Sequence, residues 1–138
     1  MSKVLFALDT SVAVPLLVAS HEAHRKVVTW AAGRQLGLSG HALPETYAVL
    51  TRLPGDARVN ASDAVRLIDD NFPRCFMLSA ELAVRAHSEL QQVGASGGAT
   101  YDGLVALAAR EHGAVLVTRD ARARPTYEAT GVRVEVLV

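Results

Sequence analysis

Four acidic residues stand at positions that solubility alone does not explain. Asp9 and Asp120 each directly follow a short apolar run, whereas Glu45 and Asp102 fall in the first turns of expected helices. Carboxylates that converge without a basic residue between them repel one another, so a cation is the natural way to hold them together. Oxygen ligands of this kind suit Mg²⁺ or Mn²⁺. Such a site supports phosphodiester hydrolysis, because the metal activates water and neutralises charge on the phosphate.

Each acid also has an ordinary structural explanation. Asp9 and Glu45 could be helix caps or first-turn charges that the helix dipole favours. Asp102 could belong to a cap region that begins at Thr100, and Asp120 could be a turn residue. The combination of two strands that end in aspartate with two acids in early helical turns favours one shared site.

Two apolar runs, Val4–Leu8 and Ala114–Thr118, predict strands buried on both faces of a parallel sheet. Short strands are expected near residues 36–39 and 75–78, and the alternating stretch 132–136 predicts a half-exposed edge strand. Helical periodicity fills the segments between. The expected order is β, α, β, α, β, α, β, β, an α/β fold with helices on both faces of a mostly parallel sheet of about five strands.

The position of the acids follows from this topology. If the strands that begin near Val4 and Ala114 are central neighbours, Asp9 and Asp120 emerge together at the carboxyl edge, where the strand order reverses and ligands bind. Glu45 and Asp102 fall in the first turns of expected helices, so all four acids could face one cleft. The apolar stripes of the expected helices include Tyr47, Val65 and Tyr101, on three different helices.

Composition predicts one domain over residues 1–138. Half of the residues are apolar, enough for a core without disulfides, and Cys75 is the only cysteine and is expected to be a buried, inert thiol. Fourteen basic and fourteen acidic residues cancel, so no global field points to a partner. The longest apolar stretch, Val12–Ser20, is too short to span a bilayer and contains Pro15, so we expect a cytoplasmic protein with no membrane partner.

The basic residues exclude several classes of enzyme. Twelve are arginines and two are lysines, Lys3 and Lys26. Neither lysine follows a glycine-rich loop, which excludes P-loop enzymes. Lysine-dependent phosphotransferases need a lysine on a strand or helix well after their first aspartate, and no lysine follows Lys26 in this chain. His21 and His24 form a His-x-x-His pair, which is one residue short of the His-Glu-x-x-His spacing of zinc sites, and we interpret them as surface histidines.

The acidic segments, taken in order, resemble the four acidic motifs of the PIN-domain ribonucleases, and the whole chain is similar to VapC-type toxins of bacterial toxin–antitoxin pairs. The matching segments are Leu8-Asp9-Thr10-Ser11, Pro44-Glu45-Thr46-Tyr47, Tyr101-Asp102-Gly103-Leu104-Val105-Ala106 and Leu116-Val117-Thr118-Arg119-Asp120. The resemblance implies a three-layer α/β/α sandwich and a Mg²⁺- or Mn²⁺-dependent endoribonuclease. It also implies a homodimer that a small VapB-type antitoxin inhibits.

The resemblance assigns roles residue by residue. It makes catalytic metal ligands of Asp9, Glu45, Asp102 and Asp120. Ser11 and Thr118 match polar positions whose hydroxyls can orient those carboxylates. The stretch after Asp120, residues 121–124, lacks the aromatic residue that many relatives place there.

Three arginines are candidates for contacts with RNA phosphates. Arg119 and Arg122 flank Asp120, and Arg52 lies seven residues after Glu45, near the same helical stripe. Each could equally be a solvated arginine or a partner for a local acid.

Two other functions fit the same residues. A catalytically silent module would bind RNA or an antitoxin through the same cleft without needing metal, and a metal phosphatase would act on small phosphate esters. A nuclease predicts that Asp9→Asn abolishes cleavage, leaves the fold intact and stabilises the metal-free protein by removing like-charge repulsion.

Overall fold

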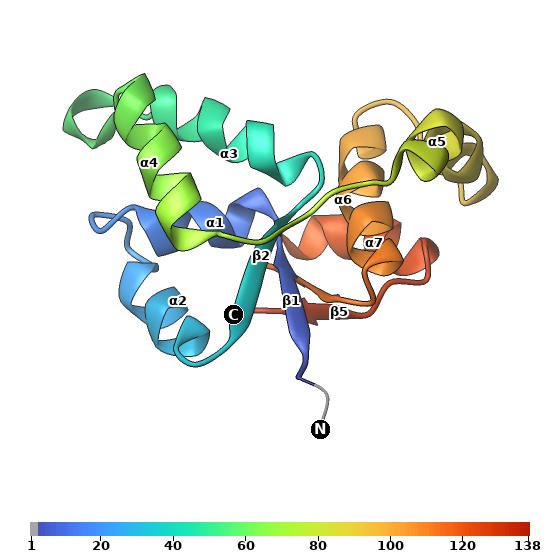
Figure 1. Ribbon diagram of the computed structural model, residues 1–138, viewed down its shortest axis with the longest axis horizontal. Helices are drawn as coiled ribbons and strands as arrows, with labels where there is room; N and C mark the ends of the chain where they lie inside the picture. Colours follow the sequence, from blue (N-terminus) through green and yellow to red (C-terminus); the bar gives the residue numbers. More distant parts are fainter. Residues whose placement is uncertain (1–2) are drawn as a thin grey trace.

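The computed structural model describes residues 3–138 and shows a five-stranded parallel sheet between two layers of helices (Figure 1). The strand order is β3-β2-β1-β4-β5. The strands are β1 (Leu5–Leu8), β2 (Gln35–Ser39), β3 (Cys75–Phe76), β4 (Val115–Thr118) and β5 (Val134–Val136). The expected α/β sandwich is therefore confirmed.

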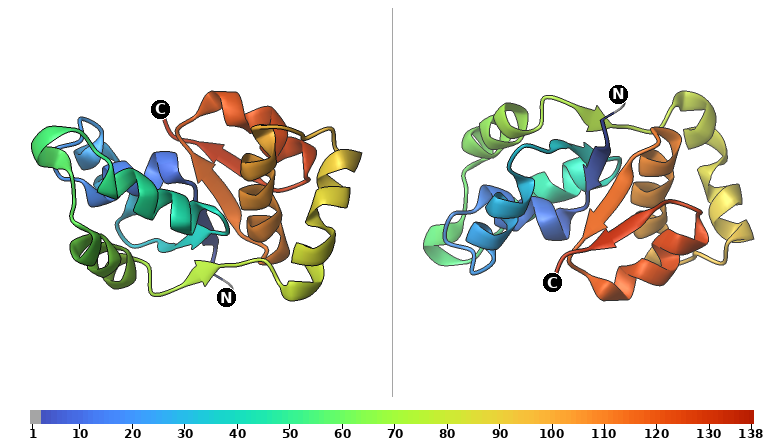
Figure 2. Two further views of the ribbon diagram at one scale, coloured as in Figure 1. Left: turned by 90° about the horizontal axis from the view of Figure 1, so that it is seen from above. Right: turned by 90° about the horizontal axis from the view of Figure 1, so that it is seen from below.

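The helices divide between the two faces of the sheet. The first four, from the first half of the chain, lie on one side, and the last three lie on the other (Figure 2). They are α1 (Thr10–Leu17), α2 (His24–Ala31), α3 (Ala42–Thr51), α4 (Ala61–Asn71), α5 (Ala80–Gln92), α6 (Ala99–Glu111) and α7 (Arg124–Ala129), with short 3₁₀ turns η1 (Gly55–Ala57) and η2 (Ala121–Ala123). Three of the four strand connections therefore contain a pair of helices, and the helices that carry Tyr47 and Val65 form one such pair, as the sequence predicts.

Strands β1 and β4 are neighbours at the centre of the sheet, as predicted. Phe6, Ala7 and Leu8 pair with Val115, Leu116 and Val117. The chain builds outward from β1 to β2 and β3, then returns to the opposite side of β1 with β4. The order of strands therefore reverses between β1 and β4, and open α/β sheets bind ligands at the point of such a reversal.

Helix α7 is an element that the sequence did not predict. The expected order ended in two consecutive strands, but β4 and β5 run parallel, and a parallel pair needs a crossover connection. The six residues of α7 are too few to show a helical period, although Pro125 at its first turn favours a helix start. The predicted edge strand at the tail is confirmed as β5.

Several apolar side chains of the predicted helical stripes remain exposed. Tyr47, Val65 and Tyr101 are 37%, 47% and 54% exposed, so these stripes are wider than the faces that the core covers. The core itself lies on both sides of β1 and β4, where Leu8 and Leu116 are fully buried.

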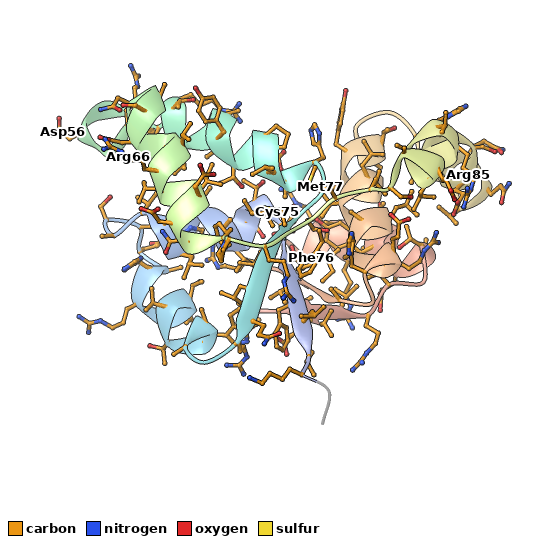
Figure 3. The ribbon with its side chains drawn as sticks, in the orientation of Figure 1. Asp56, Arg66, Cys75, Phe76, Met77 and Arg85 are labelled. Atoms are coloured by element: carbon orange, nitrogen blue, oxygen red, sulfur yellow. The ribbon has the colours of Figure 1, made fainter. Side chains whose placement is uncertain are left out.

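Cys75 is only half-buried, contrary to the expectation of a buried thiol. It lies with Phe76 on β3, which is an edge strand of two residues and leaves one side uncovered (Figure 3). Partial burial still raises the pKa of the Cys75 thiol, which keeps it protonated and unreactive near neutral pH. Within residues 3–138, no helix is long and apolar enough to cross a membrane.

Candidate active site

All four predicted acids line one small cavity at the carboxyl ends of the central strands. The cavity has a volume of about 130 Å³. Its walls are formed by Asp9, Thr10, Ser11, Glu45, Asp102, Val105, Asp120 and Tyr127. We call it the acid cavity. The topology thus brings together residues that are more than a hundred positions apart in the chain.

Asp9 is the most buried of the four, with 5% of its surface exposed. Its two carboxylate oxygens accept hydrogen bonds from different elements. The Ser11 hydroxyl donates to Oδ1 over 2.6 Å, and the Tyr127 hydroxyl donates to Oδ2 over 2.8 Å. Burial raises the pKa of Asp9, and the hydroxyls of Ser11, Thr118 and Tyr127 oppose that rise. The carboxylate is therefore held in one orientation from both sides.

Ser11 and Thr118 join the ends of β1 and β4 in a chain of hydrogen bonds. Because the single proton of Ser11 is used on Asp9, its oxygen accepts from the Arg119 backbone N–H over 2.7 Å, and it lies 3.2 Å from the Thr118 hydroxyl oxygen. The Thr118 oxygen in turn accepts from the Asp120 backbone N–H over 3.0 Å. These two hydroxyls thus fix both the Asp9 side chain and the backbone that carries Asp120.

Glu45 lies in the first turn of α3, as predicted, and its side chain is exposed at the rim of the cavity. The Thr10 hydroxyl donates to Glu45 Oε1 over 2.6 Å. Since the proton of Thr10 is used there, the buried Thr46 hydroxyl is the donor in its 3.3 Å contact with Thr10. Helix α1 therefore orients the carboxylate of α3.

Asp120 does cap a turn, so its ordinary structural explanation is also correct. Its Oδ1 accepts from the Arg122 backbone N–H over 3.0 Å at the start of η2, and the Arg122 Nε lies 3.4 Å from the same oxygen. Both contacts use Oδ1, so the capping geometry leaves Oδ2 for the cavity. Asp120 therefore both caps η2 and lines the acid cavity.

The carboxylate of Asp102 is repelled by the charges of the other three acids. It lies in the first turn of α6 and is partly exposed. Its pKa is raised, first by burial and then by repulsion from Asp9, Glu45 and Asp120. Four carboxylates therefore share one electrostatic environment in which a cation would be strongly favoured.

Tight contacts between elements set the positions of α3 and α6. Gly40 turns the chain from β2 into α3 with a φ of +52°, and a Cβ there would lie 2.9 Å from the Cβ of Ala108 on α6. The buried Ser39 hydroxyl donates to the Val105 carbonyl over 2.7 Å. At the outer surface, the rings of His41 and Tyr101 stack with centroids 4.9 Å apart. Glu45 and Asp102 are thereby held on facing helices.

The three predicted RNA-contacting arginines do not line the acid cavity. The side chain of Arg122 is 94% exposed and points to the Asp120 rim. Arg119 lines a separate cavity, and Arg52 ends α3, roughly 10 Å along the helix axis from Glu45. Across residues 3–138, no three His, Cys, Asp or Glu side chains lie close enough together to form a ready-made metal site. The acids share a cavity without forming a closed ligand shell.

Two residues of the site escaped the sequence analysis. Tyr127 supplies a hydrogen bond to Asp9 from α7, and Thr10 supplies one to Glu45 from α1. Tyr127 lies seven positions after Asp120, in a helix too short to show a helical period in the sequence. No sequence pattern therefore identified it as a residue of the site. Thr10 lies inside the first acidic motif, and its hydroxyl is the feature from which a hydrogen bond to a neighbouring carboxylate could have been predicted.

A family model and several known proteins match the chain. The PIN-domain model matches residues 6–128. Ribonuclease VapC27 of Mycobacterium tuberculosis is 55% identical over 130 residues, which cover 94% of this chain and 95% of that protein. Ribonuclease VapC40 of the same species is 38% identical over 134 residues, covering 96% and 99%.

Solved structures show the same fold at low sequence identity. The VapBC2 complex of Rickettsia felis, bound to a promoter DNA fragment, contains a chain with a TM-score of 0.65 and 18% identity. The match covers 97% of this chain and 99% of that one. The chain therefore belongs to the PIN-domain family, and its sequence relatives within that family are named VapC ribonucleases.

Proposed function

We propose that this protein is a metal-dependent endoribonuclease toxin. It hydrolyses phosphodiester bonds in cellular RNA of the transfer or ribosomal class, and a cognate VapB-type antitoxin neutralises it. The observation that carries this proposal is the acid cavity, with four carboxylates at the reversal of strand order, in a chain 55% identical to a ribonuclease VapC. The names of the relatives support cleavage of RNA over hydrolysis of small phosphate esters.

The residues of the acid cavity fit a divalent cation by their chemistry. They are oxygen donors, they repel one another, and no lysine or arginine lines the cavity. In our proposal Asp9, Glu45, Asp102 and Asp120 hold Mg²⁺, for which Mn²⁺ can substitute. When bound, the ion supplies an activated water and neutralises charge on the phosphate.

The other side chains of the site position these carboxylates. Ser11 and Tyr127 hold Asp9 from two sides, so it does not turn away from the cavity when the ion is absent. Thr118 fixes the backbone at Asp120, and Thr10 directs Glu45 inward. A pre-formed arrangement of this kind lowers the reorganisation needed when substrate binds.

We further infer a single domain over residues 1–138, a cytoplasmic location and a homodimer. An apolar cavity of about 330 Å³ between α3 and α4 supports a protein partner on that face. Exposed Tyr47 and Val65 line it, and exposed apolar side chains that gather in one place commonly mark protein interfaces.

The test is cleavage of total cellular RNA by the purified protein, freed of any copurifying partner. Reactions contain Mg²⁺, Mn²⁺ or chelator, and each is run beside Asp9→Asn and Asp102→Asn. We expect discrete RNA fragments with either metal and intact RNA with chelator or with either variant. Sequencing the fragment ends then identifies the target.

A folded, partner-free preparation that leaves RNA intact under every condition contradicts the proposal and favours the silent binding module. Turnover of p-nitrophenyl phosphate without RNA cleavage favours the phosphatase instead. Circular dichroism of each variant shows that lost activity does not reflect lost folding.

A further inference from the structure

We propose that a second cavity, on the α2 side of the molecule, binds the RNA strand that continues from the acid cavity. The inference rests on the proposed function and names where this chain holds its substrate. The second cavity has a volume of about 340 Å³ and is lined by residues of α2 and of the segment from β5 to Val138. We call it the basic cavity.

Three cationic side chains from different segments meet in the basic cavity. Lys26 comes from α2, Arg34 from the loop before β2, and Arg119 from the loop after β4. Glu135 is the acid among the lining residues, and its carboxylate accepts a hydrogen bond from the Trp30 indole N–H over 3.1 Å. The side chains that line this cavity therefore carry a net positive charge, whereas the acid cavity carries carboxylates and no basic residue.

The cations of the basic cavity are not paired with acids in the part of the chain that the structure describes. Five arginines elsewhere form ion pairs within 4.0 Å; two of them, Arg66 and Arg85, lie at opposite ends of the molecule (Figure 3). Arg34 instead stacks on Trp30, with its guanidinium carbon 4.9 Å from the ring centroid. Its charge is held in place without being neutralised, which suits an anionic ligand.

Arg119 connects the two cavities. Its backbone N–H donates to Ser11, which holds Asp9, and the next residue in the chain is Asp120. Its side chain nevertheless lines the basic cavity. A strand whose reacting phosphate lies at the carboxylates therefore meets Arg119 first when it continues toward α2.

A nucleic-acid strand needs such a contact because the acid cavity repels every phosphate that is not paired with a cation. Of the two arginines that flank Asp120, Arg122 already contacts the Asp120 carboxylate. Within the described chain, the side chain of Arg119 forms no ion pair with an acid, so it is available to a phosphate. Single-stranded nucleic acid is bound by positively charged grooves of this kind through its backbone, with strong dependence on salt.

The test uses Trp30, which is the only tryptophan in the sequence and lines the basic cavity. The full-length protein in chelator is titrated with a 12-nucleotide single-stranded RNA of mixed sequence while tryptophan fluorescence is recorded. Without metal the strand is not consumed, so binding is measured apart from cleavage. We expect a saturable fluorescence change and an apparent Kd that rises with salt.

Lys26→Gln and Arg119→Gln are the test variants, and Arg25→Gln is the matched control. Arg25 is the neighbour of Lys26 on α2, is exposed and does not line the cavity. Each test variant should raise Kd about fivefold and lower the slope of log Kd against log salt by about 0.7, because one phosphate contact is lost. Arg25→Gln should leave the slope unchanged.

Several outcomes overturn the inference. One is equal Kd and slope for test and control variants; another is a strand that binds without changing Trp30 fluorescence. A third is a loss confined to binding of the antitoxin, which would make this a protein-docking surface. Metal-dependent cleavage by wild-type protein together with any of these outcomes refutes the basic cavity and leaves the proposed function standing. Absent cleavage with intact binding refutes the nuclease instead.

Discussion

A single hydroxyl group, that of Tyr127, joins the last helix to the Asp9 carboxylate of the acid cavity. Replacing Tyr127 with Phe removes the donor to Asp9 and keeps the buried ring. We expect the free energy of unfolding to fall by about 1.5–3 kcal/mol, because a buried carboxylate oxygen loses its partner. RNA cleavage should slow as Asp9 loses its fixed orientation.

Thermal unfolding and a cleavage time course of Tyr127→Phe check this prediction. Tyr47→Phe is the control, since Tyr47 is exposed and should change stability by less than about 0.5 kcal/mol. Equal behaviour of the two variants would show that the hydrogen bond to Asp9 contributes nothing.

The pKa of Asp102 makes the stability of the metal-free protein depend on pH. Its folded-state pKa is raised above the ordinary value of 3.8, so the folded protein holds this proton more tightly than the unfolded chain does. Stability therefore falls as pH rises from that value through the raised pKa. In chelator, Asp102→Asn should unfold about 1–3 °C above wild type at pH 7.5, and the difference should disappear near pH 3.5.

Differential scanning fluorimetry across pH values checks the Asp102 prediction. Asp63→Asn is a suitable control, because Asp63 is an exposed acid that pairs with Arg66 outside the acid cavity. A Tm gain for Asp102→Asn that is constant at every pH would show that relief of charge is not its cause.

At the scale of single residues, the sequence predicted the acids that line the cavity better than the side chains that support them. The acids were recognisable because each follows a strand or opens a helix, a placement that local pattern reveals. The hydroxyls of Tyr127 and Thr10 act across the fold, and their roles depend on which helix packs beside which strand. Ser11 and Thr118, near the acids in sequence, were the supports that could be predicted.

At the scale of elements, buried strands were predictable and short connections were not. The runs that form β1 and β4 are apolar throughout, which distinguishes central parallel strands from helices. Helix α7 has six residues and no period, so its existence follows only from the parallel pairing of β4 with β5. The exposed side chains of Tyr47 and Val65 were not foreseen, because an apolar stripe looks the same whether core or partner covers it.

Gly40 sets where α3 begins and hence where Glu45 lies. An alanine there would adopt a left-handed backbone and place its Cβ 2.9 Å from Ala108 and 3.2 Å from the Leu104 carbonyl. We expect Gly40→Ala to lower the free energy of unfolding by about 2–4 kcal/mol. Gly33→Ala has a similar positive φ but no neighbour within 4 Å, so it should lose only about 1 kcal/mol.

Urea unfolding of the Gly40→Ala and Gly33→Ala variants measures the two losses under identical conditions. Equal losses would mean that contact with α6 does not constrain the turn. RNA cleavage should fall more in Gly40→Ala than in Gly33→Ala, since only the former displaces the helix that carries Glu45.

At the scale of the whole molecule, metal should stabilise the fold because the acid cavity exists only in the folded chain. Ligand that binds only the folded state raises its stability by RT ln(1 + [L]/Kd), about 2.7 kcal/mol at a hundredfold excess over Kd. We expect Mn²⁺ to raise the Tm of wild-type protein by about 5–10 °C. Asp102→Asn should lose most of this shift, because one of the four proposed ligands is gone. An unchanged wild-type Tm at millimolar Mn²⁺ would contradict metal binding at this site.

The separation in sequence between Asp9 and its supports has a consequence for the timing of activity during synthesis. Ser11 meets Thr118, and Asp9 meets Tyr127, across 107 and 118 positions of the chain. A nascent chain that has not yet released β4 and α7 from the ribosome lacks Asp120, lacks the central strand beside β1 and leaves Asp9 without its partners. Nuclease activity thus belongs to the finished chain, and ribosomes stalled midway on this message would release fragments that cannot cut RNA.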